Sequence, residues 1–320
     1  MNEHIIKILQ KQLEQYKTNS SKFWKSRALQ KGIETIMKYD KKIKSSKDII
    51  HLNGIGKGMA RRVDEIINSG TLKNVKNISQ VNKDKNKTIK LFESITGVGL
   101  KRAEEWYKMK YKTITDIKKA IKNKKIKSTH HINIGLKYYD DFKKRIPRKE
   151  MDNINKIISK IVKKTDKDLK YKMCGSYRRK LPTSGDIDII ITNPKIKDKI
   201  HNKKYLSKFV KKATECGFII DNLTNLGEKK YMGVCRLGKI ARRIDIRCFN
   251  SYEYITALIY FTGSRNFNIY LRNTALKQGY MLNEYYLMKK TGKKKIYLKY
   301  EKELFEILGI KYVNPKDRNI

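Results

Sequence analysis

Three aspartates are the residues of this sequence best suited to catalysis. Asp186 and Asp188 are separated by one residue and lead into a run of isoleucines that is typical of a β-strand. Because side chains alternate along a strand, both carboxylates lie on one face and the other face is apolar. The third, Asp245, lies in another strand-like run, residues 243–249. The pattern therefore predicts three carboxylates that can meet at one point.

Converging carboxylate oxygens suit Mg²⁺, which keeps its other coordination positions for water and substrate phosphate. An Asp-x-Asp pair alone is weak support, because it is more often the solvated end of a strand. Here Gly175-Ser176 stands nine residues before the pair, and Arg178 and Arg179 add positive charge. Ser176, Arg179 and the backbone near Gly185 can clamp phosphate oxygens, unless their role is structural. We expect a two-metal site for phosphoryl transfer, in which one ion lowers the pKa of an attacking hydroxyl and the other holds a triphosphate.

A short segment that occurs twice points to a second function. Residues 52–60 and 95–103 each contain a Gly-hydrophobic-Gly sequence, and the copies are 43 residues apart. The glycines let the backbone turn tightly, and the helix that follows offers free N–H groups to a phosphate. One copy alone is equally well explained as a plain turn between helices. Two copies in a basic chain predict helix-hairpin-helix motifs that hold the DNA backbone without reading its bases.

The elements that must position these residues change along the chain. Up to about residue 136 the apolar residues recur at intervals of three and four, which predicts short helices. After Pro147 helices and strands mix. The expected strands are 171–174, 187–192, 234–237 and 243–249. The expected helices of this part are 151–164, 206–215, one after residue 252, 266–278 and 301–308, with a break at 262–264 and a hairpin near Gly292.

The charge of the chain indicates a polyanionic partner. Lys and Arg number 76 against 31 Asp and Glu, a net charge of +45 that is spread along all 320 residues. An A+T-rich genome also inflates Lys, Asn and Ile, and we ascribe roughly a third of the excess to that cause. The 39% of hydrophobic residues is enough for two or three compact modules.

The cysteines and the apolar segments bear on where the protein acts. Cys174, Cys216, Cys235 and Cys248 lie far apart without a C-x-x-C pair, which predicts neither a zinc site nor a disulfide framework. The first residues lack an apolar signal core, and no run approaches the roughly 18 to 20 apolar residues that span a bilayer. We expect an intracellular protein that is neither secreted nor embedded in a membrane.

Several motifs together resemble one enzyme family. The segment from Gly175 to Asp188 looks like the catalytic signature of the family X DNA polymerases. Four further stretches resemble the DNA polymerase beta type, and they are 130–151, 232–235, 242–247, and 260–264 with 283–285. The similarity covers almost the whole chain.

The resemblance implies an α+β fold in four parts. The first is a helical lyase-type DNA-binding domain (1–82), and the second a helical subdomain with the second hairpin (83–144). The third is a nucleotidyltransferase-type palm of mixed sheet and helices (145–251). The fourth is a small α/β subdomain that binds the nascent base pair (252–320).

The resemblance also implies roles for individual residues. Asp186, Asp188 and Asp245 would bind two Mg²⁺ ions, or Mn²⁺ in their place, and Asp245 would be the base for the primer hydroxyl. The implied nucleotide contacts are Arg145, Ser176, Arg179, Gly185, Tyr260, Phe261, Gly263 and Asn268. The implied DNA contacts are Gly54, Gly56, Gly97, Gly99, Arg243 and Arg272. Na⁺ or K⁺ would bind backbone carbonyls of Leu52, Ile55, Ile95 and Val98.

The sequence departs from the family pattern in two places. The family's lyase nucleophile is a lysine after the first hairpin, and Arg62 stands there. A guanidinium stays protonated and cannot form the Schiff base that removes a 5′-deoxyribose phosphate. Ile50 and Gly58 replace further lysines of that pocket, so lyase activity is doubtful. Arg265 and Ile269 stand where the best-known member has an acid and a lysine, so base-pair selection is expected to differ.

We therefore expect a template-directed DNA polymerase that fills short gaps in base-excision-type repair. Its expected partners are gapped or nicked DNA and deoxynucleoside triphosphates, with no membrane, and it is expected to be a monomer in the nucleus or another site of DNA replication and repair, such as a viral factory. Two alternatives stay open: a template-independent or RNA nucleotidyltransferase on the same palm, and an inactive DNA-binding scaffold. The paired hairpins and the Tyr260 segment weigh against the first, and the three intact aspartates against the second.

Overall fold

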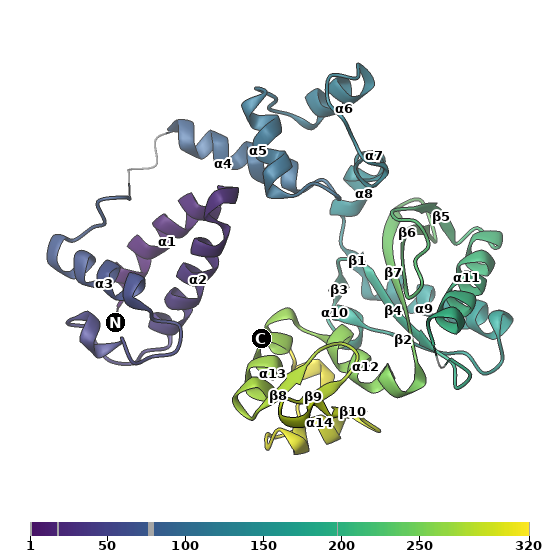
Figure 1. Ribbon diagram of the computed structural model, residues 1–320. Helices are drawn as coiled ribbons and strands as arrows, with labels where there is room; N and C mark the ends of the chain where they lie inside the picture. Colours follow the sequence, from purple (N-terminus) through teal and green to yellow (C-terminus); the bar gives the residue numbers. More distant parts are fainter. Residues whose placement is uncertain (1, 18, 76–79, 197, 320) are drawn as a thin grey trace. The chain divides into compact units, whose positions relative to one another are not determined.

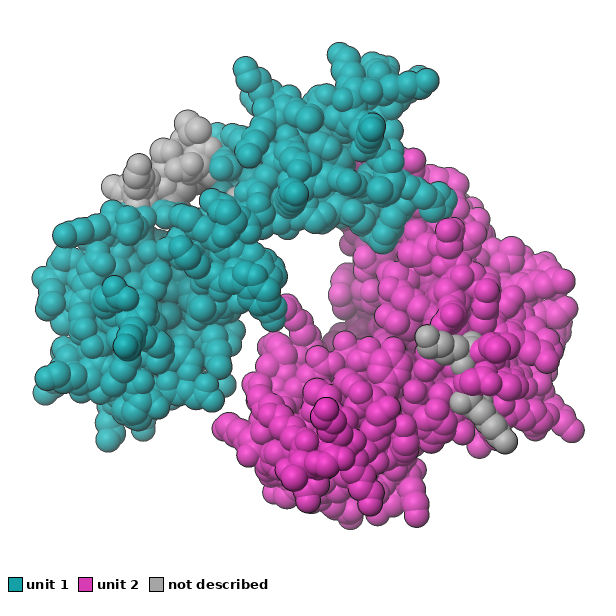
Figure 2. Space-filling view, in the orientation of Figure 1, with its two compact units in different colours: residues 1–132 teal, residues 133–320 magenta. Residues whose placement is uncertain are grey.

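The computed structural model describes residues 2–17, 19–75, 80–196 and 198–319. They fall into two compact units, unit 1 (residues 1–132) and unit 2 (residues 133–320), which Figure 2 shows in teal and magenta. The expected α+β class is confirmed, because unit 2 joins β-sheets to helices while unit 1, so far as it is described, is helical. No helix in the described ranges is both long and apolar enough to span a bilayer.

Amphipathic helices form unit 1, as the spacing of its apolar residues predicts. The apolar faces of the first three helices meet in one core that includes Leu9, Ile33 and Val63. Phe92 and Trp106 pack edge to face with 5.8 Å between ring centroids. The helices are α1 (Glu3–Lys17), α2 (Phe23–Met37), α3 (Lys57–Ser69), α4 (Gln80–Glu93), α5 (Leu100–Lys108), α6 (Ile114–Lys122) and α7 (His130–Lys137), which continues into unit 2 (Figure 1).

A five-stranded sheet forms the centre of unit 2. The strands follow the order β2-β4-β7-β6-β5, in which β4 and β7 run parallel and the other neighbours antiparallel. Alternate residues of β4, namely Ile187, Ile189 and Ile191, join a core built with α9 and α11 (Figure 1). The strands are β2 (Lys170–Met173), β4 (Ile187–Thr192), β5 (Ile219–Asn222), β6 (Lys230–Arg236) and β7 (Ala241–Phe249). The helices are α8 (Tyr139–Lys143), α9 (Arg148–Thr165), α10 (Gly175–Arg178) and α11 (Lys199–Glu215).

The C-terminal part of unit 2 has a separate small core. Phe267, Leu271 and Phe305 are buried in it. Its elements are α12 (Tyr254–Thr262), α13 (Arg265–Lys277), β8 (Tyr280–Leu282), β9 (Leu287–Lys289), β10 (Lys295–Ile296) and α14 (Glu301–Ile307). The strands β1 (Ile146–Pro147) and β3 (Thr183–Ser184) form a short ladder near the start of the unit.

The structure extends two of the expected elements and adds others. The helix expected at 206–215 begins at Lys199, where the Asp198 side chain accepts a hydrogen bond from the backbone N–H of His201 and caps it. The strand expected at 234–237 begins at Lys230. Strands β5 and β8 were not expected, because they are only four and three residues long and rely on pairing with a neighbouring strand.

Candidate active site and DNA-binding hairpins

The parallel pairing of β4 with β7 brings two of the three aspartates together. Asp188 and Asp245 are register partners across this pair, and Asp186 lies in the bend just before β4. The isoleucines on either side of Asp188 face the core under α9 and α11. The carboxylates therefore lie on the opposite face of the sheet from these helices.

The three aspartates lie close enough for their charges to affect one another. Burial raises the pKa of Asp188 to about 8, and the charges of Asp186 and Asp245 add to the rise. Burial also raises the pKa of Asp245, again with a contribution from Asp186. The opposing cations are Arg179 and Arg243 at Asp188, and Lys230, Arg247 and Arg243 at Asp245. Burial and the repulsion between the carboxylates therefore outweigh the attraction of these cations at Asp188 and Asp245.

A divalent cation fits the donor set of this patch. Three neighbouring carboxylates, of which Asp188 and Asp245 have raised pKa values, offer hard oxygen ligands, and a bound cation would relieve their repulsion. In the described part of the chain, no three His, Cys, Asp or Glu side chains are already grouped as metal ligands. Asp186 Oδ2 instead accepts a hydrogen bond from Arg243 Nη2 at 3.0 Å. The hydrogen bond between Asp186 and Arg243 would therefore have to break before the Asp186 carboxylate could bind a metal ion together with Asp188 and Asp245.

The Gly175-Ser176 motif packs against the Asp188 carboxylate and is bonded to β3. Gly175 has a φ of +54°, and a Cβ there would overlap the Asp188 carboxylate. The backbone N–H of Cys174 donates to the carbonyl of Asp188 at 2.8 Å. Ser176 Oγ donates to Ser184 Oγ at 2.9 Å, which ties the motif to β3. The glycine is thus required by the close approach of Asp188.

The two arginines that follow this motif have different surroundings. Arg178 is largely buried and is ion-paired with Glu301, which also binds Arg318 at 2.8 Å. Arg178 is therefore bound within the fold, and Arg179 rather than Arg178 is among the cations that act on Asp188. Arg179 donates to the Thr262 carbonyl at 2.6 Å and to Asn319 Oδ1 at 2.7 Å. It also lies close enough to Asp188 to be affected by its charge.

Arg145 lies beside the glycine that precedes the aspartate pair. Its Nε donates to Thr183 Oγ1 at 3.0 Å and its Nη2 to the Thr183 carbonyl at 2.8 Å. A Cβ on Gly185 would be 3.5 Å from Arg145 Nη1. The structure therefore brings together Arg145 and Gly185, two of the expected nucleotide contacts.

Residues expected around the incoming sugar and base form a second cluster. Asn268 Nδ2 donates to the Tyr260 carbonyl at 2.7 Å, and the Arg272 guanidinium lies 5.0 Å from the Tyr260 ring centroid. Tyr260 and Phe261 are in edge contact at 5.1 Å between centroids. α12 ends at Gly263, whose φ is +69°. The side chains of Arg265 and Ile269 are exposed on the next helix, α13.

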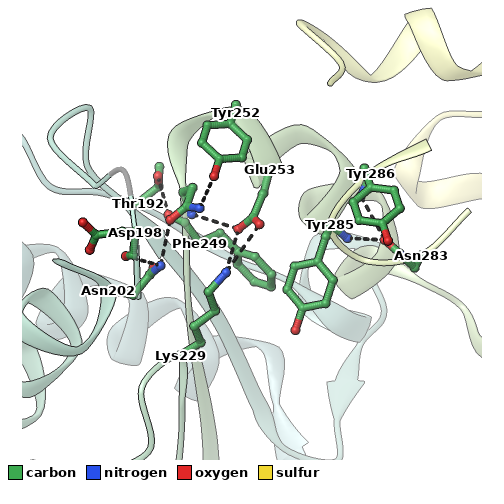
Figure 3. Close-up of polar contacts among 11 residues, drawn as sticks. Thr192, Asp198, Asn202, Lys229, Phe249, Tyr252, Glu253, Asn283, Tyr285 and Tyr286 are labelled. Atoms are coloured by element: carbon green, nitrogen blue, oxygen red, sulfur yellow. Dashed lines mark hydrogen bonds and ion pairs between the residues drawn. The ribbon is translucent and has the colours of Figure 1, made fainter. Parts of the chain in front are cut away.

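A polar network at the start of α12 was missed from the sequence. The Lys229 ammonium contacts Glu253 at 3.1 Å, and Glu253 accepts from the backbone N–H of Asn250 at 3.2 Å (Figure 3). Asn202 Nδ2 donates to Asn250 Oδ1 at 2.7 Å. This network joins α11 and the connection before β6 to the segment between β7 and α12. Asn250 and Glu253 form a capping box, a pattern that the sequence shows. No local signal connects that pattern to Lys229 and Asn202.

The two hairpins of unit 1 share one backbone geometry. Gly54 and Gly97 have φ values of +102° and +92°, so both turns use a conformation that other residues rarely adopt. Gly56 and Gly99 cap α3 and α5 with φ values of −102° and −100°. A Cβ on either of these cap glycines would meet nothing within 4 Å. The helix N-termini behind them are therefore open to a ligand.

The carbonyls expected to hold a monovalent ion belong to these turns. The carbonyl of Leu52 accepts from the N–H of Ile55 at 3.1 Å, and that of Ile95 from the N–H of Val98 at 3.0 Å. The equivalent bonds show that the repeat extends to the hydrogen bonding of the turns. Ion binding there stays a prediction.

Arg62, at the position of the family's lyase lysine, is tied into unit 1. Its Nε donates to Gln12 Oε1 at 2.7 Å, and its Nη1 donates to the Gly58 carbonyl at 2.6 Å. Gln12 is 2% exposed, so this contact joins α1 to α3. Arg62 acts here as a structural link between helices.

Comparison with known proteins gave four matching family models. They are a helix-hairpin-helix domain (residues 1–72), the fingers domain of DNA polymerase lambda (90–143), the DNA polymerase beta palm (145–251) and the DNA polymerase beta thumb (257–319).

Three curated relatives resemble the chain over most of its length. DNA polymerase lambda of Rattus norvegicus is 32% identical, over 99% of this chain and 56% of the relative. DNA polymerase lambda of Arabidopsis thaliana is also 32% identical, over 91% and 57%. DNA nucleotidylexotransferase of Xenopus laevis is 28% identical, over 87% and 60%. The chain thus spans well under two thirds of these relatives.

Proposed function

The chain belongs to the family X DNA polymerases, and from this premise we propose that it is a template-directed DNA polymerase that fills short gaps during base-excision-type repair. The observation that carries the proposal is the pairing of Asp188 with Asp245 across β4 and β7, with Asp186 in the bend just before β4. The proposal includes the division into parts at 1–82, 83–144, 145–251 and 252–320. It also includes gapped DNA and deoxynucleoside triphosphates as substrates.

The three aspartates would hold the divalent cations, Mg²⁺ or Mn²⁺, on which the reaction depends. Bound cations would supply Lewis acidity at the primer 3′-hydroxyl and neutralise charge on the triphosphate. The Asp245 carboxylate would accept the proton of the 3′-hydroxyl as that oxygen attacks the α-phosphate, while the bond from the α-phosphorus to the bridging oxygen breaks and pyrophosphate leaves.

The cationic and small residues near the aspartates would position the nucleotide. Arg145, Arg179, Ser176 and Gly185 would contact the phosphates, since arginine forks and a side-chain-free backbone suit phosphate oxygens. Tyr260, Phe261 and Gly263 would flank the sugar. Asn268 and Arg272 would contact the nascent base pair, and Arg243, once free of Asp186, would contact DNA.

Primer extension on a one-nucleotide gap tests this function, with each deoxynucleoside triphosphate offered alone. We expect incorporation of the complementary nucleotide only, and only with a divalent cation. Incorporation of all four, or extension of a single-stranded primer, would favour the activity named for the Xenopus laevis relative. The absence of any incorporation on gapped DNA would favour the inactive scaffold.

The lyase activity associated with the first domain is proposed to be weak or absent. Arg62 cannot form a Schiff base, and its hydrogen bonds to Gln12 and Gly58 hold it between helices. We expect borohydride to trap almost no adduct with a pre-incised abasic strand. Arg62→Lys should raise trapping, whereas the matched change of its exposed neighbour, Arg61→Lys, should not. Strong trapping by the natural protein would mean that another lysine of unit 1 acts as the nucleophile.

A further inference from the structure

A cavity lies on the far side of the palm from the aspartates. It has a volume of about 560 Å³, within the range of about 300–1,000 Å³ typical of ligand clefts. It is lined by residues of α9, the end of α11 and the connection between β6 and β7. Because α9 and α11 cover the face of the sheet opposite to Asp188 and Asp245, the cavity is not part of the polymerase site.

The floor of this cavity is apolar. Ile161 and Phe218 are 4% and 3% exposed, and Ile157 lies half-buried beside them. Leu237, at the turn after β6, is 39% exposed and forms one wall. An apolar side chain of a partner would find buried contacts here.

The rim of the cavity is strongly basic. Lys160 and Lys164 lie one turn apart on α9, with Lys212 and Arg236 on other elements. The single acid in the lining, Glu215, is taken by Lys212 at 3.0 Å. Among the residues that the structure describes, Lys160, Lys164 and Arg236 have no carboxylate within ion-pair distance. These three cations of the rim therefore have no counter-charge within the protein, and the carboxylates of a binding partner could provide it.

We propose that this cavity docks an acidic peptide segment of a partner protein, with one or two bulky apolar side chains as anchors. The basic groups come from α9, α11 and β6, and a peptide can present several carboxylates to them. Apolar anchors in a pocket with a charged rim are a common way to bind a peptide.

A nucleic acid strand suits the cavity less well. Single strands bind by stacking bases on exposed aromatic rings. The one aromatic ring of the lining, Phe218, is 3% exposed and forms floor rather than a stacking surface. The phosphates of a DNA duplex could bind the basic residues of the rim, but they would not fill the apolar floor of the cavity. The apolar floor therefore favours a peptide with apolar side chains over a nucleic acid.

Selection from a random dodecapeptide library displayed on phage tests the proposal, at physiological salt and with gapped DNA already bound to the full chain. We expect the selected pool to be enriched in Asp and Glu together with Leu, Ile or Phe. A pool without both enrichments, or no selectable binder, overturns the proposal. Loss of binding when single-stranded DNA is added overturns it in favour of nucleic acid.

Matched variants locate the binding of a selected peptide. Lys164→Glu and Leu237→Ser should each raise its Kd about tenfold or more, the effect of losing one good contact. Lys163→Glu changes the same charge one residue away, outside the lining, and Ile200→Ser alters a side chain that is 79% exposed on α11. These two controls should change the Kd less than about twofold. If the control variants and the cavity variants weakened peptide binding equally, the peptide would be binding through the general positive charge of the protein, and the proposal would be overturned.

The lone exposed cysteine gives a second readout. Cys216 lines the cavity and is exposed, whereas Cys174, Cys235 and Cys248 are buried. Bound peptide should slow the alkylation of Cys216 and leave incorporation on gapped DNA unchanged. Unaltered alkylation at saturating peptide would place the peptide elsewhere and overturn the proposal.

Discussion

The carboxylates of Asp186, Asp188 and Asp245 repel one another, and this repulsion predicts how the loss of one carboxylate affects the protein. Asp245→Asn should lower incorporation by about 10²–10⁴-fold, the range for loss of a general base. The variant should bind gapped DNA and unfold at the same temperature as the natural protein or a higher one, because a like charge has been removed from beside Asp186 and Asp188.

Steady-state incorporation and thermal unfolding check this prediction. Asp186→Asn should behave in the same way, and Asp168→Asn, on the surface beside Lys195, should alter neither quantity. If a pure preparation of Asp245→Asn incorporated nucleotides as fast as the natural protein, the three-carboxylate site would be ruled out.

Gly175 offers a sharper test of the close approach to Asp188. Gly175→Ala should destabilise the fold by about 1–2 kcal/mol from the left-handed backbone, and should also displace the Asp188 carboxylate and reduce incorporation. Gly279→Ala is the matched control, since Gly279 has a φ of +78° but a Cβ there would meet nothing within 4 Å. Gly279→Ala should lower the free energy of unfolding by a similar amount, but the rate of incorporation per folded molecule should not change. Equal activity of the two variants would contradict the packing argument.

At the scale of elements, the junction between β7 and α12 depends on a mostly buried ion pair. The Lys229 and Glu253 side chains are 23% and 11% exposed. Glu253→Gln keeps the size of the side chain but leaves Lys229 without its counter-charge, and should lower the free energy of unfolding by about 1–3 kcal/mol. Denaturant unfolding measures the loss.

The same substitution on the surface provides the control for this junction. Glu215→Gln removes the partner of Lys212, a pair at 3.0 Å whose side chains are about half exposed. It should cost less than about 1 kcal/mol. Similar losses for Glu253→Gln and Glu215→Gln would mean that burial does not strengthen the pair at the junction.

At the scale of the whole molecule, the net charge of +45 governs how the protein meets DNA. Each phosphate that is neutralised releases counterions, so the logarithm of affinity for gapped DNA should fall with the logarithm of salt by about 0.9 per contact. We expect a steep fall between about 50 and 200 mM salt and little dependence on base sequence. Titrations at several salt concentrations would reveal the slope, and a flat line would contradict phosphate tracking.

Much of this protein follows from local sequence patterns. Apolar spacing predicts the helices of unit 1, alternation predicts the apolar face of β4 opposite Asp188, and the two Gly-hydrophobic-Gly segments predict matching turns. Backbone preference and side-chain periodicity act over a few residues, so a single sequence carries them directly. The catalytic motif also indicates the family that the comparisons identify.

Other features depend on contacts between distant segments and appear only in the tertiary structure. The parallel register of β4 and β7 sets Asp245 beside Asp188, and long-range packing decides that register. Packing also separates Arg178, bound by Glu301, from its neighbour Arg179, and turns Arg62 into a link to Gln12. Local sequence determined which groups carry charge and which face they occupy. The tertiary structure decided which charges meet, because each ion pair depends on how distant segments fold together.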